Sequence, residues 1–266
     1  MTAALENITV VLVEPATPAN VGSVARVLKN TGISRLALVN PAEWDTPEAR
    51  WTAHASEDIL DQCLLFDDLQ SAVSGAHLVL GTTHRQGRFR KVTPDYRAVL
   101  ADTAALAREH EVALVFGREK DGLWRRELMS CHQLVTVPSA VPYPSFNLSH
   151  AVLLIVHELF LAASALEQTA QDSDQNGDPI TPLANAAEVE SVHDQVVRAM
   201  RLIGFRPYND DPSNFSRVLK RFLTRTPLER RDAMVIHRIC GQIRKFAART
   251  TGGGRVSDQP PNTSKS

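Results

Sequence analysis

The 266-residue sequence has few cysteines, and they are widely spaced. Cys63, Cys131 and Cys240 form no C-x-x-C pair, which argues against a disulfide framework and a zinc ribbon and fits a reducing cytoplasm. No apolar run approaches the roughly 20 residues that a membrane helix needs. The N-terminus also lacks the basic segment followed by an apolar segment that marks a secretory signal. We therefore expect a cytoplasmic protein with no membrane partner.

The glycine patterns that bind phosphate are also missing. The first strand-like run, Ile8–Val13, is followed by Glu-Pro-Ala-Thr-Pro-Ala-Asn-Val-Gly, which holds one glycine where a dinucleotide fold has G-x-G-x-x-G. The chain has no Walker sequence either. Nucleotide hydrolysis and NAD chemistry are therefore disfavoured, and a nucleotide-binding oxidoreductase is kept only as a distant alternative.

Signatures of metal binding and of nucleophilic catalysis are weak. His150 and His157 lie seven residues apart on one predicted helix face, with no third ligand nearby and no H-E-x-x-H pattern. We interpret them as core or interface histidines. Cys131 stands beside His132 without a glycine elbow or a partner acid, which disfavours a catalytic thiol. We expect no metal.

The net charge of −1 conceals a strong local imbalance. Residues 167–197 contain seven acids and no Lys or Arg, whereas residues 198–249 contain thirteen Lys or Arg against four acids, a net charge of +9. A second basic run, Arg85–Lys91, places Phe89 among four cations. Local fields of this kind steer polyanions, so RNA is a candidate partner, and solvated helix faces are the alternative.

Alternating strand-like and helix-like runs predict an α/β fold with a mostly parallel sheet and helices on both faces. The helix expected over residues 21–30 has Pro18 ahead of it, Asn20 as its N-cap and Gly32 as its stop. A long apolar helix after Asn147 is expected to be buried in a core or at a subunit interface. The strand-like runs are Ile8–Val13, Arg35–Val39, His77–Leu80, Val112–Phe116 and Leu134–Val137.

The composition divides the chain into four parts. Residues 1–166 are expected to form the catalytic domain, 167–187 an acidic linker, 188–250 a small basic all-α domain, and 251–266 a disordered tail.

Three segments far apart in the sequence place glycine, proline, asparagine and charged residues at the ends of strand-like runs. They are the cluster of Asn20, Gly22 and Arg26, the loop Gly117–Gly122, and the stretch Val137–Ser149 with its three prolines. Ligands of an open α/β sheet bind outside the carboxyl ends of its strands. The three segments together indicate an active site, and the chain is expected to be an enzyme. Arg26 lies among apolar helix neighbours, so it needs either a carboxylate partner or an anionic ligand.

The same segments carry a family resemblance. They read Asn-x-Gly-x-x-x-Arg from Asn20, Phe-Gly-x-Glu-x-x-Gly-Leu from Phe116, and Ser-x-Asn-Leu-Ser from Ser145. In this order they resemble the three motifs of the SpoU branch of the SPOUT RNA methyltransferases. The opening Val-Leu-Val-Glu-Pro and the short helical region after the catalytic domain are most similar to the TrmJ type. The resemblance covers residues 7–166.

This resemblance implies a homodimer, S-adenosylmethionine as the methyl donor, and a trefoil knot in the C-terminal part of the catalytic domain. The implied reaction is 2′-O-methylation of tRNA at nucleoside 32, a C or U of the anticodon loop. A methyltransferase acting on ribosomal RNA and a non-catalytic RNA-binding protein with the same fold are the alternatives.

The resemblance also implies the site residues. The central role falls to Arg26, with Asn20 and Ser145 orienting the ribose and Glu119 fixing the arginine or the loop. Because a guanidinium is effectively always protonated, we expect Arg26 to hold a phosphate or the developing alkoxide rather than to act as a base. The residues expected around the methyl donor are Thr82, Thr83, His84, Gly117, Val137, Pro144, Ser145, Phe146 and Leu148.

Overall fold

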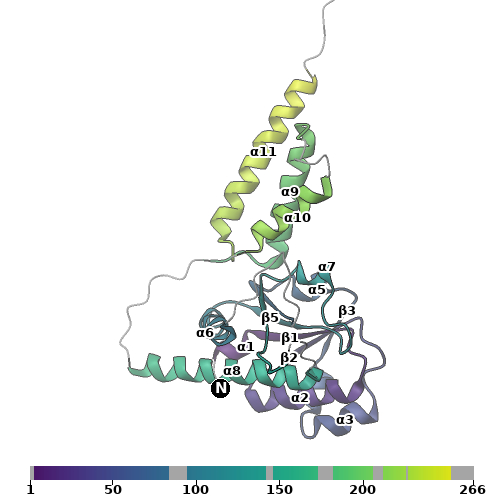
Figure 1. The fold of residues 1–266 in the computed structure, drawn as a ribbon. Coiled ribbons are helices and arrows are strands. Elements are labelled where there is room, and N and C mark those ends of the chain that lie inside the picture. Colours follow the sequence, from purple (N-terminus) through teal and green to yellow (C-terminus); the bar gives the residue numbers. More distant parts are fainter. Residues whose placement is uncertain are drawn as a thin grey trace, which may run out of the picture.

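A computed structural model describes residues 3–83, 95–141, 146–172, 182–205, 212–225 and 227–252. Its centre is a six-stranded sheet in the order β3-β2-β1-β5-β4-β6 (Figure 1). All of its strand pairs are parallel, which confirms the predicted mostly parallel sheet. The strands are β1 (Ile8–Val13), β2 (Arg35–Val39), β3 (Leu64–Phe66), β4 (Leu78–Thr82), β5 (Val112–Phe116) and β6 (Gln133–Val135).

Eight helices precede, connect or follow these strands within the described residues. The sequence predicted no structure for the stretch that holds β3, α3 (Pro47–Ala53) and α4 (Glu57–Asp61), because these elements are too short to show a periodic pattern. The helices are α1 (Ala3–Glu6), α2 (Pro18–Thr31), α3 (Pro47–Ala53), α4 (Glu57–Asp61), α5 (Leu69–Val73), α6 (Tyr96–Leu106), α7 (Arg125–Leu128) and α8 (Leu148–Asp172).

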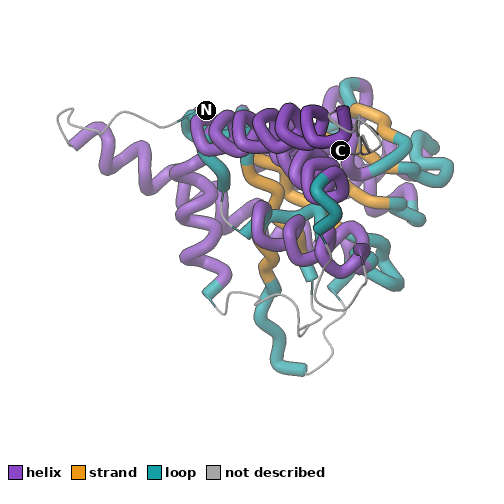
Figure 2. The backbone as a smooth tube through the Cα atoms, turned by 90° about the horizontal axis from the view of Figure 1, so that it is seen from above, coloured by secondary structure: helices purple, strands orange, loops and turns teal. Residues whose placement is uncertain are grey.

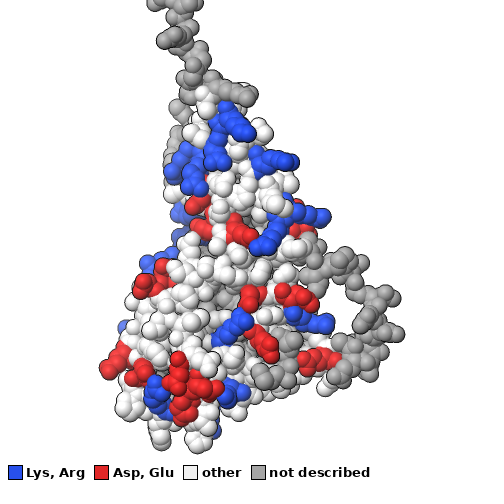
Figure 3. Space-filling model, turned by 180° about the vertical axis from the view of Figure 1, so that it is seen from behind, with Lys and Arg blue, Asp and Glu red and all other residues white. Residues whose placement is uncertain are grey.

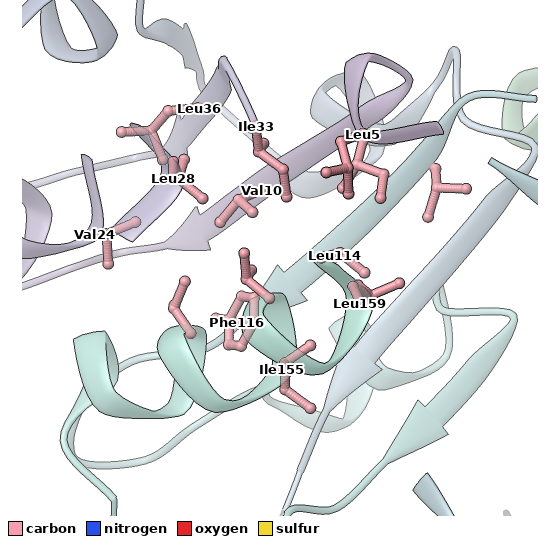
Figure 4. Close-up of a cluster of buried hydrophobic side chains, with 14 of the residues drawn as sticks. Leu5, Val10, Val24, Leu28, Ile33, Leu36, Leu114, Phe116, Ile155 and Leu159 are labelled. Atoms are coloured by element: carbon pink, nitrogen blue, oxygen red, sulfur yellow. The ribbon is translucent and has the colours of Figure 1, made fainter. Parts of the chain in front are cut away.

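Helices cover both faces of the sheet, as expected, and β1 shows why. Its alternate residues point to opposite faces. Val10 belongs to a core formed with α2, α6 and α8, and its neighbour Val11 belongs to a second core formed with α5. Figure 4 shows the first core, where Val10 and Phe116 of the sheet face Leu28 of α2 and Ile155 of α8. Figure 2 gives the same arrangement from above, with strands in orange and helices in purple.

Helix α2 begins earlier than expected. Its N-cap is Thr17 and its first residue is Pro18, so the prediction of Asn20 as N-cap is wrong. Proline suits the first helical position because its fixed φ is already helical and its missing N–H would have had no partner there. The helix ends at Gly32 with a left-handed φ of 81°, as predicted. Gly22 has a packing role, since a Cβ there would collide with the carbonyl oxygen of Ala49 in α3.

Helix α8 is buried on one side only. Val152 and Ile155 are fully buried, whereas Leu153 is 42% exposed and Leu161 is 47% exposed, so the prediction of burial holds for one face. The helix runs on to Asp172, into the segment expected to be linker. Its portion Leu148–Gln168 is long and apolar enough to cross a membrane, which corrects the expectation that no run approaches this length. One such helix does not by itself indicate a membrane protein, because a core helix of a globular protein can have the same length and composition.

Three further helices stand on the side of the sheet that carries α5 and α7 (Figure 1). They are α9 (Ala186–Leu202), α10 (Pro212–Leu223) and α11 (Arg230–Gly252). Val189 and Val192 of α9, Leu223 of α10 and Ala233 of α11 share a small apolar cluster. Helix α9 starts with a capping box in which Asn185 and Glu188 each accept from the other's backbone N–H, so its start lies before the predicted residue 188. The basic run of residues 85–91 and the expected tail after residue 252 lie outside the described residues.

Candidate active site

The three motif segments meet through a chain of side-chain hydrogen bonds. The amide of Asn20 donates to Glu119 Oε1 at 2.9 Å, and the amide of Asn147 donates to Asn20 Oδ1 at 2.9 Å. These residues come from α2, from the loop after β5 and from the start of α8. The structure therefore brings the predicted residues Asn20 and Glu119 together, as their places at strand ends suggested.

Glu119 serves as the cap of α2 from a distant part of the chain. Its carboxylate accepts from the backbone N–H groups of Ala16 at 3.1 Å and Thr17 at 3.1 Å, while the Thr17 side chain makes no capping bond. Burial raises the pKa of Glu119, but the hydrogen bonds from Asn20, Ala16 and Thr17 together lower it by more than burial raises it. The pKa of Glu119 is therefore below its usual value. A carboxylate that is ionised and held by several donors suits a structural anchor better than a general base.

Asn147 links this series of hydrogen bonds to the start of α8. Its Oδ1 accepts from the backbone N–H of Ser149 at 2.9 Å and from the Ser149 hydroxyl at 2.7 Å, in the manner of an N-cap. Its amide nitrogen is then directed at Asn20. The orientation of both asparagines is thus set from the two ends, by Glu119 and by the first turn of α8.

A pocket lies beside this network, at the carboxyl ends of β4, β5 and β6. The loop of residues 117–122, including Glu119 and Asp121, forms one wall, and apolar side chains such as Phe116 and Val135 form another. Six of the nine residues expected around the methyl donor line it, namely Thr82, Thr83, Gly117, Val137, Phe146 and Leu148. The other three, His84, Pro144 and Ser145, lie outside the described residues.

Gly117 is needed by the loop itself. A Cβ at this position would collide with the backbone of Gly122 and Leu123. The loop folds back so that the N–H of Gly122 donates to the carbonyl of Arg118 at 2.9 Å, and Gly122 takes a φ of 64°. The two glycines therefore allow a compact loop at the pocket, because an L side chain at either place would clash or strain the backbone.

Arg26 is not part of this network. It lies six positions after Asn20 on α2, about 240° further around the helix axis, and its side chain is exposed. The described residues contain no ion pair to Arg26, so a carboxylate partner is not found there. Arg26 lines a groove between α2, α3 and α8, together with Trp51, His150, Leu153 and His157.

The remaining candidate residues are structural or lie elsewhere. His150 and His157 are exposed in that groove. The prediction that they are core residues is therefore wrong, and the alternative that they lie at a subunit interface stays a prediction. Cys131 is fully buried, and a Cβ at Gly81 would lie 2.6 Å from its Sγ, so it is a packing residue. Within the described residues, one group has the spacing of metal ligands, Glu190, His193 and Asp194 of α9, and it does not line the pocket.

Sequence reasoning missed Arg118 and left Asn147 out of the expected site. The guanidinium of Arg118 pairs with Glu14 and Glu127 and is largely buried. The sequence marked the loop as charged, but its partners lie 104 residues before it and nine after it, so spacing alone gave no signal. Asn147 was visible as the centre of the third motif.

The chain is similar to known proteins along most of its length. The family model of the SpoU rRNA methylases matches residues 7–157. The chain is 32% identical over 240 residues to the tRNA (cytidine/uridine-2′-O-)-methyltransferase TrmJ of Klebsiella pneumoniae, covering 90% of this chain and 97% of the relative. It is 33% identical over 251 residues to the tRNA (cytidine/uridine/adenosine-2′-O-)-methyltransferase TrmJ of Pseudomonas aeruginosa, covering 91% and 96%.

Solved structures show the same fold. The crystal structure of TrmJ from Z. mobilis ZM4 superposes with a TM-score of 0.74 at 23% identity, covering 89% of this chain and 98% of that one. A probable methylase family protein from Haemophilus influenzae superposes with a TM-score of 0.59 at 28% identity, covering 92% and 99%. With a family model that spans all six strands of the sheet and relatives that match nearly end to end, the chain belongs to the SpoU methylase family.

Proposed function

We propose that this protein transfers a methyl group from S-adenosylmethionine to a ribose 2′-hydroxyl of tRNA, at the C or U of position 32 in the anticodon loop. The main observation in support is the hydrogen-bonded series of Glu119, Asn20 and Asn147, which joins all three motif segments beside one pocket. The names of the relatives, which specify cytidine and uridine 2′-O-methylation of tRNA, support the substrate class.

The pocket suits the methyl donor, the cofactor of this family. Its apolar side chains, among them Val137 and Leu148, match a flat adenine ring, and the carboxylate of Asp121 matches ribose hydroxyls or a cationic centre. The hydroxyl of Thr82 already donates to the Val115 carbonyl at 3.1 Å. The pocket wall at Thr82 therefore offers S-adenosylmethionine mainly its shape and its backbone groups. When bound, S-adenosylmethionine supplies an electrophilic methyl group on sulfonium.

The protein must make a weak nucleophile reactive. A ribose hydroxyl ionises far above neutral pH, so methyl transfer needs stabilisation of the developing alkoxide or removal of its proton. Glu119 and Asn20 are engaged with each other and with the start of α2, which leaves them to position the segments. Arg26 is the exposed cation that we assign to the alkoxide or the adjacent phosphate, with Ser145 orienting the ribose.

We further propose a homodimer whose contact includes α2 and α8. Leu153 and Leu161 of α8 are exposed apolar side chains, and so is Trp51 of α3, which is 81% exposed. Arg26 borders the same groove. Since Arg26 points away from the pocket of its own chain, its proposed role depends on the second copy.

The finer architecture is also a proposal. We infer that the C-terminal part of the catalytic domain forms the trefoil knot of the family, and that α9, α10 and α11 form a separate basic domain that grips tRNA away from the reacting nucleotide. The α9–α11 cluster has its own small core, and Lys and Arg side chains are spread over the upper part of the molecule (Figure 3). We also propose a cytoplasmic location, in keeping with a function in tRNA modification.

Nucleoside mass spectrometry tests the proposal. Unmodified tRNA and ribosomal RNA are incubated separately with the pure protein and S-adenosylmethionine, then digested. We expect 2′-O-methylcytidine or 2′-O-methyluridine in tRNA, mapped to position 32 by fragment analysis. Methylation of ribosomal RNA alone would favour the alternative that the family's rRNA name suggests. Base methylation, or no methyl transfer to either RNA, would reject both, and a failure to bind the donor would favour a non-catalytic RNA-binding protein.

A further inference from the structure

We propose that Arg118 is a positioning residue that holds the loop of residues 117–122 in the shape that binds the methyl donor. The proposal rests on the function proposed above. It adds a residue that contributes to the site mainly through the contacts of its guanidinium with Glu14, Glu127 and the loop itself.

Arg118 makes a double fork with two carboxylates. Its Nε and Nη2 donate to Glu14 Oε2 at 2.8 Å and Oε1 at 2.6 Å, and its Nη1 and Nη2 donate to Glu127 Oε2 at 3.0 Å and Oε1 at 2.9 Å. The side chain of Arg118 is 9% exposed and that of Glu127 is 5% exposed. Only a guanidinium presents enough donors in one plane to serve two carboxylates in this way.

The same side chain closes the loop on itself. Arg118 Nη1 donates to the carbonyl of Gly122 at 3.3 Å, and the backbone of the two residues forms an antiparallel bridge. The guanidinium also lies over the ring of Trp124, 3.6 Å from its centroid. One residue therefore fixes the start of the loop, its end and the approach to α7.

Arg118 and Glu119 anchor the loop to the turn between β1 and α2 from two adjacent positions. Arg118 holds Glu14, which directly follows β1 and has a φ of 46°, a value that glutamate rarely takes. Glu119 holds Ala16, Thr17 and Asn20 on the other side of that turn. A change at Arg118 thus alters the pocket wall and the residue that carries the motif network.

Such a cluster is better suited to setting geometry than to adding stability. Two carboxylates and a guanidinium lose much hydration when they are buried, and well-packed apolar residues commonly replace such groups without loss of stability. The fork instead restricts the loop to one arrangement. We therefore expect its loss to act on donor binding in particular.

The test compares Arg118→Gln and Arg118→Lys in the full chain. Calorimetry measures the Kd of S-adenosylmethionine, and steady-state kinetics on tRNA give KM for the donor and kcat. We expect both variants to raise the Kd and the KM by about tenfold or more, because small displacements of positioning groups have effects of this size. The kcat at saturating donor should stay within about threefold, the pattern of lost ground-state binding.

Arg126→Gln is the matched control. Arg126 lies against the same Trp124 ring, 4.8 Å from its centroid. Its side chain is 72% exposed, however, and its Nε comes no closer than 3.8 Å to the Glu127 carboxylate. Its Kd for the donor should equal that of the unchanged protein.

A double variant, Arg118→Gln with Glu127→Gln, separates positioning from charge compensation. It removes the uncompensated buried carboxylate, so the melting temperature should recover relative to Arg118→Gln while the Kd stays raised. Full recovery of the Kd in the double variant would overturn the proposal, as would an unchanged Kd in a folded Arg118→Gln protein. If the unchanged protein does not bind the donor, the proposed function fails, and this inference falls with it.

Discussion

Asn20 donates a hydrogen bond to Glu119 across 99 residues of sequence, at 2.9 Å. This bond joins α2 to the loop after β5, and Asn147 extends it to α8. The relationship makes Glu119 a suitable residue for testing whether the network supports both folding and the site.

Replacing Glu119 with Gln removes the charge at the start of α2 and leaves one oxygen where two accepted. We expect the free energy of unfolding to fall by about 1–2 kcal/mol, the scale of a lost helix cap or charged hydrogen bond. Because the folded-state pKa of Glu119 is lowered, its contribution is present above its ordinary pKa of about 4.5 and disappears as the pH falls through the folded-state value. Denaturant unfolding at pH 7 and near pH 4 should therefore show a difference from the unchanged protein that shrinks at the lower pH. Glu43→Gln, at an exposed position, should show no difference at pH 7.

Arg26→Lys tests whether the guanidinium fork is required for methyl transfer. Lysine keeps the charge but loses the planar pair of donors, so we expect kcat to fall by about a hundredfold with folding unaffected, the scale of one lost transition-state contact. Methyl transfer from labelled S-adenosylmethionine to tRNA is the measurement. Lys29→Gln is the control, because it removes an exposed cation of α2, the helix that carries Arg26, where Lys29 pairs with Asp58 of α4. Near-normal turnover of Arg26→Lys would contradict the clamp.

Leu153→Glu combined with Leu161→Glu places two charges on the exposed face of α8. If this face joins two copies, light scattering should report a halved mass, and methyl transfer should fall with it, because Arg26 borders the same groove. Leu64→Glu is the control, since Leu64 of β3 is also more than half exposed but lies at the edge of the sheet. An unchanged mass would place the contact elsewhere or show that the chain is a monomer.

Truncation after Asp172 tests the basic helices. The cut falls at the end of α8 and leaves the whole sheet, so donor binding should be retained. We expect tRNA affinity to fall and its dependence on salt to flatten, because fewer phosphates are neutralised. The pair Arg238→Gln and Lys245→Gln in the full chain should move both quantities in the same direction. If affinity and salt slope are unchanged in both proteins, the charge of +9 is a solvated surface.

Gly22→Ala tests whether the motif glycine serves packing. The added methyl group would collide with the carbonyl of Ala49, so we expect a loss of about 1–3 kcal/mol in unfolding free energy, the usual cost of overpacking. Gly75→Ala is the control, because nothing lies within 4 Å of the position of its Cβ. Equal stabilities would show that α3 moves aside and that Gly22 is retained for another reason.

The parallel sheet and the position of the candidate site at its edge were both predictable from local sequence patterns. Runs such as Ile8–Val13 and Val112–Phe116 are short, apolar and β-branched, and they became central strands buried on both faces. The motif segments follow strands that are all parallel, so their carboxyl ends meet at one edge whatever the details of packing. Local chemistry therefore predicted that these segments lie close together, and two of them, the loop Gly117–Gly122 and the stretch Val137–Ser149, contribute residues that line the pocket.

Which side chains contact one another at that edge could not be predicted from the sequence, because those contacts depend on how distant segments pack. The N-cap of α2 is Thr17 and not the expected Asn20, and the backbone N–H of Thr17 is held by Glu119, about a hundred residues away. Arg26 shares a motif with Asn20 yet faces a different groove, because six positions on a helix do not return to the same side. Arg118 found its partners in Glu14 and Glu127 through the folding of the loop. A motif records which residues occur together along the chain, whereas hydrogen bonds and ion pairs depend on where their backbone is placed, and that placement is set by the packing of the whole sheet and its helices.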